Sequence, residues 1–367
     1  MTTAAREHAP ASERARTSEH TTTSRSHPAA SHTGDGLEAP FAITGTGIHI
    51  PPAVVTNEDL TRTLSRTGDW ITARTGIRER RRLAAELATS DMCLAAAHPA
   101  LAAARLEPSD LDAVIVASYT QDQPMPSTSL IVKDGLAASR ALALDVGQAA
   151  CASGVHAVLL AAHLLQNPSI RTVLVIGADC ASRITRPDDR TAGVFFGDAA
   201  AAAVFTRSST EGAGLLSYDI GSQLSYAVQI AAGGSRLPSS PETLAAGTHY
   251  VSMDGPAVWD TATTRLPESI TNATRHAGLT PQEIDHYFLH QANINILDEA
   301  RRRLGIDADR VPVTLDRLGN TGAAGLFTAL HRTVSAGRLR PGDTYVMSAI
   351  GAGFHWGTLC LRQGRSS

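Results

Sequence analysis

The chain has 367 residues, of which 43% are hydrophobic, and its 32 Lys and Arg residues against 35 Asp and Glu leave a net charge of −3. This length corresponds to roughly two domain equivalents, which is enough chain to bury a large core. The charge balance excludes a protein that holds nucleic acid mainly through basic residues, and an aromatic content of 4% disfavours base-stacking surfaces.

Residues 1–40 differ in composition from the rest of the chain, because they are rich in Ser, Thr, Ala, Arg and His and contain almost no large apolar residue. Such a segment buries too little apolar surface to offset its ordering entropy, so we expect a disordered tail whose removal leaves stability unchanged. The segment lacks the apolar stretch that a secretory signal contains. Glu7, Glu13 and Glu19 also interrupt the acid-poor composition that is typical of a transit peptide.

After residue 41, short β-rich runs alternate with Ala-rich helical stretches. We predict strands at 111–120, 171–179, 285–290, 343–351 and 357–362, and helices at 93–106, 154–166, 259–278 and 296–305. The strands are near-continuous apolar runs, which is typical of strands buried on both faces. The longest apolar stretch, 141–165, is interrupted by Asp145, Gln148 and His156 and predicts a strand and a core helix, not a membrane span. The alternation predicts an α/β protein with helix-covered sheets.

The segment 43–51 begins like a dinucleotide-binding fingerprint. Gly45 and Gly47 fit the first two glycine positions, but Ile50 occupies the third. The segment therefore predicts a strand ending in a tight turn, and NAD binding is not expected.

One sequence pattern occurs twice. The first copy contains Leu106, Pro108, Asp110 and Asp112, and the second contains Leu279, Pro281, Glu283 and Asp285, each just before a predicted strand. Gly177 and Gly351 mark equivalent positions further along the two copies. The repeat predicts a duplicated fold with an N-terminal half at 41–215, a C-terminal half at 216–367, and a ligand site where the halves meet.

The four cysteines, Cys93, Cys151, Cys180 and Cys360, lie far apart and form no CxxC pair. We therefore expect neither a structural zinc site nor a thioredoxin-type pair, and four reduced thiols in a cytoplasmic protein.

Cys151 stands out because a strand is predicted to end near Val146 and a helix to begin at about Ser153. A thiol at that junction lies near the positive end of the helix dipole, which favours the thiolate. The small neighbours Ala150 and Ala152 permit a sharp turn, as at the nucleophile of a hydrolase. The alternative is a buried, unreactive cysteine.

Three further segments carry candidate polar groups. His290 ends the predicted strand 285–290, where the repeat places a site, and is an acid/base candidate. Asn320 lies in a loop of small residues before a helix, a position that by itself predicts a turn or cap residue. The run Gly351-Ala352-Gly353 offers backbone N–H groups of the kind an oxyanion hole needs, although glycine runs end many strands.

Together these segments resemble the thiolase superfamily and, within it, β-ketoacyl-[acyl-carrier-protein] synthase III. The resemblance runs from about residue 42 to residue 362 and implies a five-layered αβαβα fold of two similar halves and a homodimer. The motifs that match in order and spacing are ITGTGIHIPPAVVTNEDL, WITARTGIRERR, DVGQAACASG, FFGDAAAAAVF, HQANINIL, GNTGAAG and GAGFHWG.

The resemblance implies that Cys151 accepts an acyl group from acyl-CoA. His290 and Asn320 would then polarise the carbonyl of a malonyl thioester, so that loss of CO2 gives an enolate that attacks the acyl-cysteine and forms a 3-ketoacyl product. The implied oxyanion hole consists of the N–H groups of Cys151 and of Ala352 or Gly353. No metal and no cofactor beyond the CoA thioester substrate is implied, and neither nucleic acid nor a membrane is an expected partner.

The resemblance also implies a CoA site. Trp70 and Arg74 match the pair that encloses the CoA adenine, and Arg190 and Asn293 match further contacts to CoA. A core aromatic is the alternative reading of Trp70.

The chain departs from the family pattern around the acyl pocket. Met125 replaces a phenylalanine that reaches across the dimer towards this pocket, which Phe196 is also expected to line. The nucleophile motif, usually Cys-Ala-Gly-Phe, is Cys-Ala-Ser-Gly here, and Pro256, His355 and Gly322 are further departures. A flexible methionine suits a larger or branched acyl group, so these changes favour polyketide or other specialised priming over housekeeping fatty-acid initiation.

The sequence defines the acyl acceptor less well than the acyl donor. A carrier-docking arginine that usually follows the catalytic histidine by five residues is Asn295 here, and Asp260 replaces a nearby lysine. The second substrate is therefore a malonyl thioester or another acyl acceptor, with a dedicated acyl carrier protein as a candidate partner.

Two alternatives to condensation stand beside it. One is acyl transfer from the same acyl-cysteine to an alcohol, an amine or a carrier without decarboxylation, which the sequence does not separate from condensation. The other is a non-catalytic protein that keeps the fold, which the complete set of Cys151, His290 and Asn320 disfavours.

Overall fold

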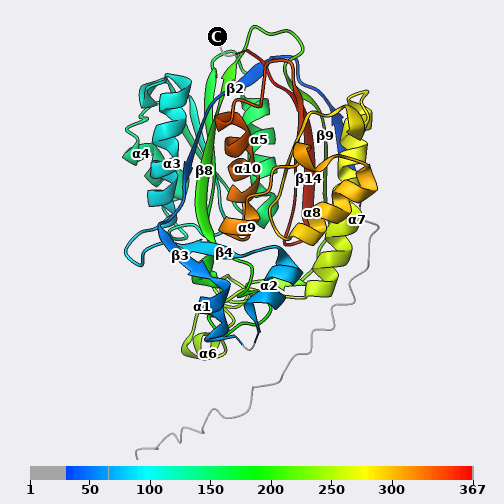
Figure 1. Cartoon of the computed structure of the whole chain (residues 1–367). Coiled ribbons are helices and arrows are strands. Elements are labelled where there is room, and N and C mark those ends of the chain that lie inside the picture. The colour runs from blue at the N-terminus through cyan, green and yellow to red at the C-terminus, as the bar shows by residue number, and fades with distance from the viewer. Residues whose placement is uncertain (1–29, 65, 366–367) are drawn as a thin grey trace, which may run out of the picture.

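A computed structural model describes residues 30–64 and 66–365 (Figure 1). Two five-stranded sheets alternate with three layers of helices, which confirms the predicted αβαβα fold of two similar halves. The first sheet contains, in spatial order, β2 (Phe41–His49), β8 (Asp198–Arg207), β7 (Thr172–Cys180), β5 (Ala113–Ala117) and β6 (Leu142–Val146). The second contains β1 (Ser31–Asp35), β9 (Gly214–Ser222), β14 (His355–Arg362), β13 (Thr344–Gly351) and β12 (His286–Leu289).

The helices form the other three layers. Helices α3 (Thr89–Ala104) and α4 (Thr128–Gly135) cover the outer face of the first sheet. Helices α5 (Ser153–Leu164) and α10 (Ala324–Ser335) lie between the two sheets, and α7 (Gly255–His276) and α8 (Ile294–Leu304) cover the outer face of the second (Figure 1). The largest apolar core surrounds α5 and α10, and separate cores lie beneath α3 and beneath α7 and α8.

Smaller elements gather at one end of the layers, at the bottom of Figure 1. They include the antiparallel pair β3 (Ala53–Thr56) and β4 (Glu79–Arg82), the pair β10 (Val228–Gln229) and β11 (Ser252–Met253), and the helices α1 (Asn57–Thr61), α2 (Gly68–Thr75), α6 (Pro241–Ala245) and α9 (Leu315–Leu318). No helix in the described part of the chain is long and apolar enough to span a bilayer.

Gly45 and Gly47, which fit only part of a dinucleotide-binding motif, lie inside strand β2. A Cβ atom on Gly45 would lie 2.2 Å from the Ala100 carbonyl oxygen, and one on Gly47 would lie 2.2 Å from the Ala96 carbonyl oxygen. Both glycines therefore let α3 pack directly on the strand, which is a packing role and not a phosphate-binding one.

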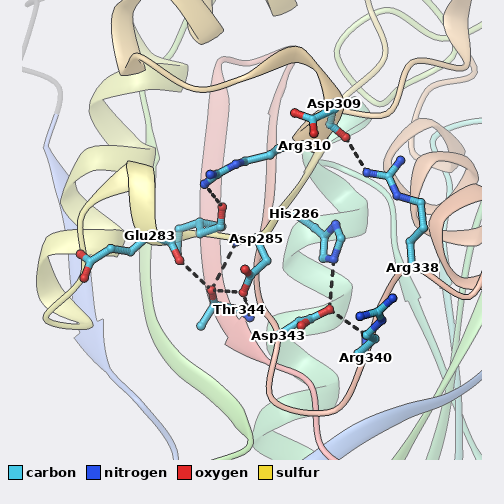
Figure 2. Close-up of polar contacts among 10 residues, drawn as sticks. Glu283, Asp285, His286, Asp309, Arg310, Arg338, Arg340, Asp343 and Thr344 are labelled. Atoms are coloured by element: carbon cyan, nitrogen blue, oxygen red, sulfur yellow. Dashed lines mark hydrogen bonds and ion pairs between the residues drawn. The ribbon is translucent and has the colours of Figure 1, made fainter.

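The repeated acidic element has the same structure in both halves. The Asp112 N–H donates to the Thr172 carbonyl at 3.0 Å, and the Thr172 N–H donates back to the Asp112 carboxylate. In the second half, the Asp285 N–H donates to the Thr344 carbonyl at 3.0 Å, and the Thr344 N–H donates to the Asp285 carboxylate (Figure 2). Each aspartate thus joins two neighbouring parallel strands, which confirms the duplication read from the sequence.

The N-terminal segment requires a correction. Residues 31–35, expected to belong to a disordered tail, form β1 and pair antiparallel with β9 from Ser31 opposite Gly221 to Asp35 opposite Ser217. Backbone pairing needs no large apolar side chain, so composition alone missed this strand. The rest of the expected tail, residues 1–29, lies outside the described residues.

The boundary between the halves also differs slightly from the prediction. Strand β8 ends at Arg207 and β9, which belongs to the second sheet, begins at Gly214. The predicted division after residue 215 therefore falls inside β9, and β1 joins the second sheet although it precedes the first half in the chain.

Candidate active site

Cys151 lies in a sharp turn between strand β6 and helix α5. The residue before it, Ala150, has a φ of 47°, a left-handed conformation that a residue with a side chain rarely adopts. The Ser153 hydroxyl donates to the Gly147 carbonyl at 3.0 Å and closes the turn. Strained backbone of this kind is concentrated at functional sites, so the turn agrees with the predicted nucleophile position.

The pKa of the Cys151 thiol is raised in the structure, whereas the sequence predicted an environment that favours the thiolate. Burial, together with the nearby Asp179 carboxylate, raises the pKa of Cys151 to about 12. The Tyr119 hydroxyl and the Cys151 backbone N–H lower this pKa but do not reverse the shift. The predicted preference of the helix end for thiolate is therefore outweighed by desolvation, and the thiol is protonated in the unliganded site.

The other three cysteines lie in the core. Cys93, Cys180 and Cys360 are buried and free, and burial raises the pKa of each thiol above its usual value. These three thiols lie outside both cavities described below, so Cys151 is the cysteine placed for chemistry.

His290 follows the last residue of β12, as predicted. Its backbone N–H donates to the Ser348 carbonyl at 2.9 Å, and the residue is only 5% exposed. Burial lowers the pKa of His290 to about 4, against the opposing effect of a hydrogen bond to the Gly322 backbone. The imidazole is therefore neutral at neutral pH and can donate one proton or accept another.

Asn320 is held in place by backbone bonds to the segment that carries Phe196. The Asn320 N–H donates to the Phe195 carbonyl at 2.8 Å, and the Asn320 carbonyl accepts from the Gly197 N–H at 3.0 Å. Its side-chain oxygen accepts from the Gly322 N–H at 3.0 Å. Because the oxygen is engaged, the amide group of Asn320 presents its N–H donors to a ligand.

The glycine run after β13 lies against the nucleophile turn. A Cβ atom on Gly351 would lie 2.0 Å from the Ala149 carbonyl oxygen and 3.0 Å from the Cys151 nitrogen, so only glycine fits at this position. Ala352 and Gly353 line the same cavity as Cys151. The structure thus places the predicted oxyanion-hole residues together, and it adds Gly351 as the residue that permits their close approach.

One inner cavity of about 370 Å³ contains the predicted catalytic groups. Its lining includes polar side chains and the segment 351–353, namely Cys151, His290, Asn320, Tyr119, Gly351, Ala352 and Gly353. The remaining walls are mostly apolar and include Phe196, Ile184, Val228, Val251, Leu266, Ile350 and Phe354. The two halves therefore contribute jointly to the site, since Cys151 belongs to the first half and His290 and Asn320 to the second.

An outer cavity of about 1040 Å³ contains the residues expected to bind CoA. Trp70, Arg74, Arg190 and Asn293 all line it, and the Arg66 guanidinium lies 4.5 Å from the Trp70 ring centroid. The inner and outer cavities share the lining residues Phe196, Met253, Val258, Ala292, Ile296 and Asn320. A long thioester could therefore lie in the outer cavity with its acyl end beside Cys151.

Asn293 and Met125 fit their expected roles less directly. The Asn293 side chain caps α8 by accepting from the Asn295 N–H, and it donates to the Arg74 carbonyl, so it also holds the wall of the cavity that it lines. Met125 is 82% exposed and lines neither cavity of its own chain. The expectation that Met125 reaches the acyl pocket across a dimer therefore stays a prediction.

Sequence reasoning missed two residues beside the nucleophile. Tyr119 lines the inner cavity, and the buried Asp179 accepts hydrogen bonds from the segment 118–120 and from the Ala323 N–H, so that it joins the loops on both sides of Cys151. Burial raises the pKa of Asp179 to about 7. The sequence signal for these two residues was Gly322, which departs from the family pattern. Its close approach to Tyr119 and Asp179 becomes visible only in the structure.

Comparison with known proteins agrees with this geometry. Models of 3-oxoacyl-[acyl-carrier-protein] synthase III match residues 144–224, and models of the C-terminal part of that enzyme match residues 274–363. A β-ketoacyl-[acyl-carrier-protein] synthase III of Symbiobacterium thermophilum is 43% identical over 328 residues, covering 89% of this chain and 99% of the relative.

Solved structures show the same relationship. The 3-oxoacyl-[acyl-carrier-protein] synthase III of Aquifex aeolicus VF5 superposes with a TM-score of 0.80 at 33% identity, covering 88% of this chain and 99% of that one. The priming β-ketosynthase of the R1128 polyketide pathway superposes with a TM-score of 0.82 at 28% identity, covering 90% and 98%. The chain therefore belongs to the β-ketoacyl-[acyl-carrier-protein] synthase III family of acyl-transferring condensing enzymes.

Proposed function

We propose that this enzyme transfers an acyl group from acyl-CoA to Cys151 and condenses it with a malonyl thioester to give a 3-ketoacyl product. The observation that carries the proposal is one inner cavity lined by Cys151, His290 and Asn320 that shares lining residues with an outer cavity containing Trp70 and Arg74. The first set of residues suits thioester chemistry, and the second suits the nucleotide end of CoA.

In the loading step, the protonated Cys151 thiol must lose its proton before its sulfur attacks the thioester carbonyl. His290 is the neutral base that lines the same cavity, and the proton would pass through it to the departing CoA thiolate. The N–H groups beside Cys151 and in the segment 352–353 would stabilise the carbonyl oxygen as it becomes negative.

In the condensing step, His290 and Asn320 would each donate a hydrogen bond to the malonyl thioester oxygen. Loss of CO2 leaves an electron pair that is shared between carbon and this oxygen, so two neutral donors lower the energy of the enolate. The carbanion attacks the acyl carbon, the carbon–sulfur bond to Cys151 breaks, and the electron pair returns to sulfur.

We further propose that the product primes a polyketide or another specialised pathway. The supporting observations are the altered acyl-pocket motif and the similarity to a solved polyketide priming ketosynthase. The outer cavity is lined by Asp260 and Asn295 in addition to arginines, and the Asn295 amide is bonded to the Arg74 carbonyl. This mixed charge suits a dedicated carrier or malonyl-CoA better than a general acidic carrier.

The homodimer belongs to the same proposal. Strand β6 forms an edge of the first sheet. Three apolar side chains are exposed in this region: Leu142 on β6, Leu130 on α4, and Met125 on the loop before α4. Pairing of β6 with β6 of a second copy would cover these side chains and satisfy the strand edge. We place the enzyme in the cytoplasm, with CoA thioesters as substrates and no other cofactor.

The test is to incubate the protein with a panel of acyl-CoA substrates and to follow Cys151 acylation by intact mass. Malonyl-CoA or malonyl-carrier is then added across a salt series, and CO2 and ketoacyl product are measured. We expect loading, CO2 release and a 3-ketoacyl product, with little use of a housekeeping carrier. Acyl transfer to an alcohol or amine without CO2 would support the non-decarboxylating alternative.

The matched control is Cys151→Ala, in which acyl loading should be abolished because the acyl acceptor is absent. The remaining thiols, Cys93, Cys180 and Cys360, are buried and should stay unmodified. Acyl mass that persists in Cys151→Ala, or that maps to one of these three cysteines, would contradict the assignment of the nucleophile.

A further inference from the structure

Tyr119 is fixed next to the nucleophile by its neighbours in the chain. It follows strand β5, and its backbone N–H donates to the Asp179 carboxylate at 3.0 Å. The side chain of Ser118 and the backbone of Thr120 donate to the same carboxylate, at 3.0 and 3.2 Å. This anchored segment directs the Tyr119 side chain into the inner cavity, which it lines together with Cys151.

The Tyr119 hydroxyl is buried, and Tyr119 lines the same cavity as Cys151. The two groups interact, and this interaction lowers the pKa of the thiol. The contact lacks the geometry of a well-formed hydrogen bond, and no other group among the described residues bonds this oxygen. A buried hydroxyl without a full partner carries a free-energy cost, so its retention in a reactive cavity points to a partner formed during the reaction.

Gly322 makes room for the tyrosine ring. A Cβ atom on Gly322 would lie 2.8 Å from Tyr119 Cε1 and 2.1 Å from the Asp179 carboxylate, and Gly322 has a φ of 58°. A larger residue at 322 would therefore displace the ring or the carboxylate. The unusual glycine in the Asn320 loop and the tyrosine beside Cys151 form a matched pair.

We propose that Tyr119 is a further catalytic residue, whose hydroxyl donates a hydrogen bond to the Cys151 sulfur whenever that sulfur carries negative charge. This proposal rests on the nucleophilic role of Cys151 given above. Burial and the negative groups around it keep the Tyr119 hydroxyl protonated, because its pKa lies well above the usual value. The hydroxyl is therefore a neutral donor throughout the working pH range.

Two steps of the reaction place this charge on sulfur. In loading, the thiol proton leaves first, and the resulting thiolate attacks the acyl-CoA carbonyl carbon. In condensation, the carbanion attacks the acyl carbon, the carbon–sulfur bond breaks, and the electron pair returns to the Cys151 sulfur. Decarboxylation of malonyl thioester takes place while the sulfur is a neutral thioester, so Tyr119 should not affect that step.

The test compares the wild-type enzyme with Tyr119→Phe, which keeps the ring and removes only the hydroxyl. Iodoacetamide alkylation of Cys151 is followed across pH by intact mass, and acyl loading and CO2 release are measured separately. At each pH the alkylation of Cys151 should slow by about tenfold or more, and acyl loading should slow by about tenfold or more. CO2 release from malonyl thioester by the preloaded acyl-enzyme should be unchanged.

The other titratable groups near Cys151, Asp179 and His290, are present in both proteins, so they cancel in the comparison. Tyr287→Phe is the matched control, because it removes a buried hydroxyl that donates to the Pro281 carbonyl away from both cavities. It should leave alkylation unchanged. If Tyr119→Phe does not fold, 3-fluorotyrosine at position 119 provides a stronger donor and should speed the alkylation of Cys151.

An unchanged alkylation profile and unchanged loading in folded Tyr119→Phe would overturn this role, as would equal losses in loading and CO2 release. The alkylation experiment does not require a substrate. If no acyl-CoA loads the wild-type enzyme, the proposed function fails, while the alkylation profiles still decide whether Tyr119 contacts the thiolate.

Discussion

At the scale of single residues, burial determines the protonation state of the catalytic side chains before substrate binds. His290 is nearly fully buried, and its pKa of about 4 lies below the ordinary value of 6.5. Its neutral form is present above about pH 4, so this residue donates a hydrogen bond without a positive charge. Asn320 is 7% exposed and carries no charge at any pH. The cavity therefore offers an enolate two neutral donors.

We expect His290→Ala and Asn320→Ala to slow CO2 release from malonyl thioester by about 10²- to 10³-fold, and to slow acyl loading less. The reason is that both donors stabilise the enolate oxygen, a charge that is absent during loading, whereas in loading only His290 acts, as the base that takes the thiol proton. Each half-reaction can be timed separately by CO2 capture and by intact mass. Equal losses in the two half-reactions of Asn320→Ala would contradict this division of roles.

The same assay tests the state of His290 through pH. Because the neutral imidazole persists above its folded pKa of about 4, His290 should not titrate between about pH 5 and 8, and CO2 release should show no transition from this residue near pH 6.5. A loss of activity with a midpoint near 6.5 would show that the imidazole titrates as if it were exposed.

The sequence predicted those site residues that are marked by their residue type and by their position at the end of a strand or the start of a helix. Cys151 at a strand–helix junction and His290 at a strand end are local patterns, and both side chains line the inner cavity. Tyr119 was missed because its partner, Gly322, is distant in sequence and only the fold brings them together. The direction of the Cys151 pKa shift was wrong because desolvation depends on surrounding atoms that a local pattern does not reveal.

At the scale of elements, the most informative strand is β1. Its contacts reach beyond backbone pairing: the Thr33 hydroxyl donates to the Asp219 carboxylate at 3.1 Å, and the Trp356 indole donates to the Ser31 hydroxyl at 3.1 Å. His276 lies 2.8 Å from the Asp35 carboxylate. The strand therefore joins β9, β14 and α7, although composition predicted no structure there.

We expect a chain that begins at residue 41 to melt several degrees below a chain that begins at residue 30. Removing 30–40 deletes β1, exposes the edge of β9, and leaves the Trp356 indole without its partner. Thermal unfolding of the two purified chains at equal concentration measures the effect. Equal melting temperatures would show that β1 adds no stability.

The long apolar strands were predicted more reliably than the polar edge strand β1. The apolar runs at 171–179 and 343–351 became β7 (Thr172–Cys180) and β13 (Thr344–Gly351) almost residue for residue. These strands are buried on both faces, so their composition is distinctive. An edge strand such as β1 is stabilised by backbone hydrogen bonds on one side, and any polar sequence can supply these.

At the scale of the whole molecule, the two halves match strand for strand except at their edges. In the first sheet the edge beyond β5 is β6, whereas the second sheet ends at β12 and gains β1 on the opposite side. The repeat in the sequence predicted the shared strands. It did not predict the difference at the edges, because β6 and β1 have no counterpart in the other copy.

We expect Leu142→Asp to shift the protein from dimer towards monomer. Leu142 is 48% exposed on β6, and a dimer formed there would bury an unpaired carboxylate in the variant. Light scattering coupled to size exclusion gives the mass of each species. Leu244→Asp on α6, where the leucine is 56% exposed, is the control and should keep the wild-type mass. A wild-type monomer, or an unaffected dimer in Leu142→Asp, would contradict pairing through β6.

The position of β1 has a consequence for synthesis on the ribosome. Thr33 leaves the ribosome before its partner Asp219, which lies 186 residues later in the chain. At about 5 to 20 residues per second, this strand waits roughly 10 to 40 s for the partner strand to be made. An apolar strand left unpaired for that time would be free to associate with other nascent chains. The sequence SHTGD contains no apolar side chain, so β1 can remain hydrated until β9 arrives and captures it through the backbone.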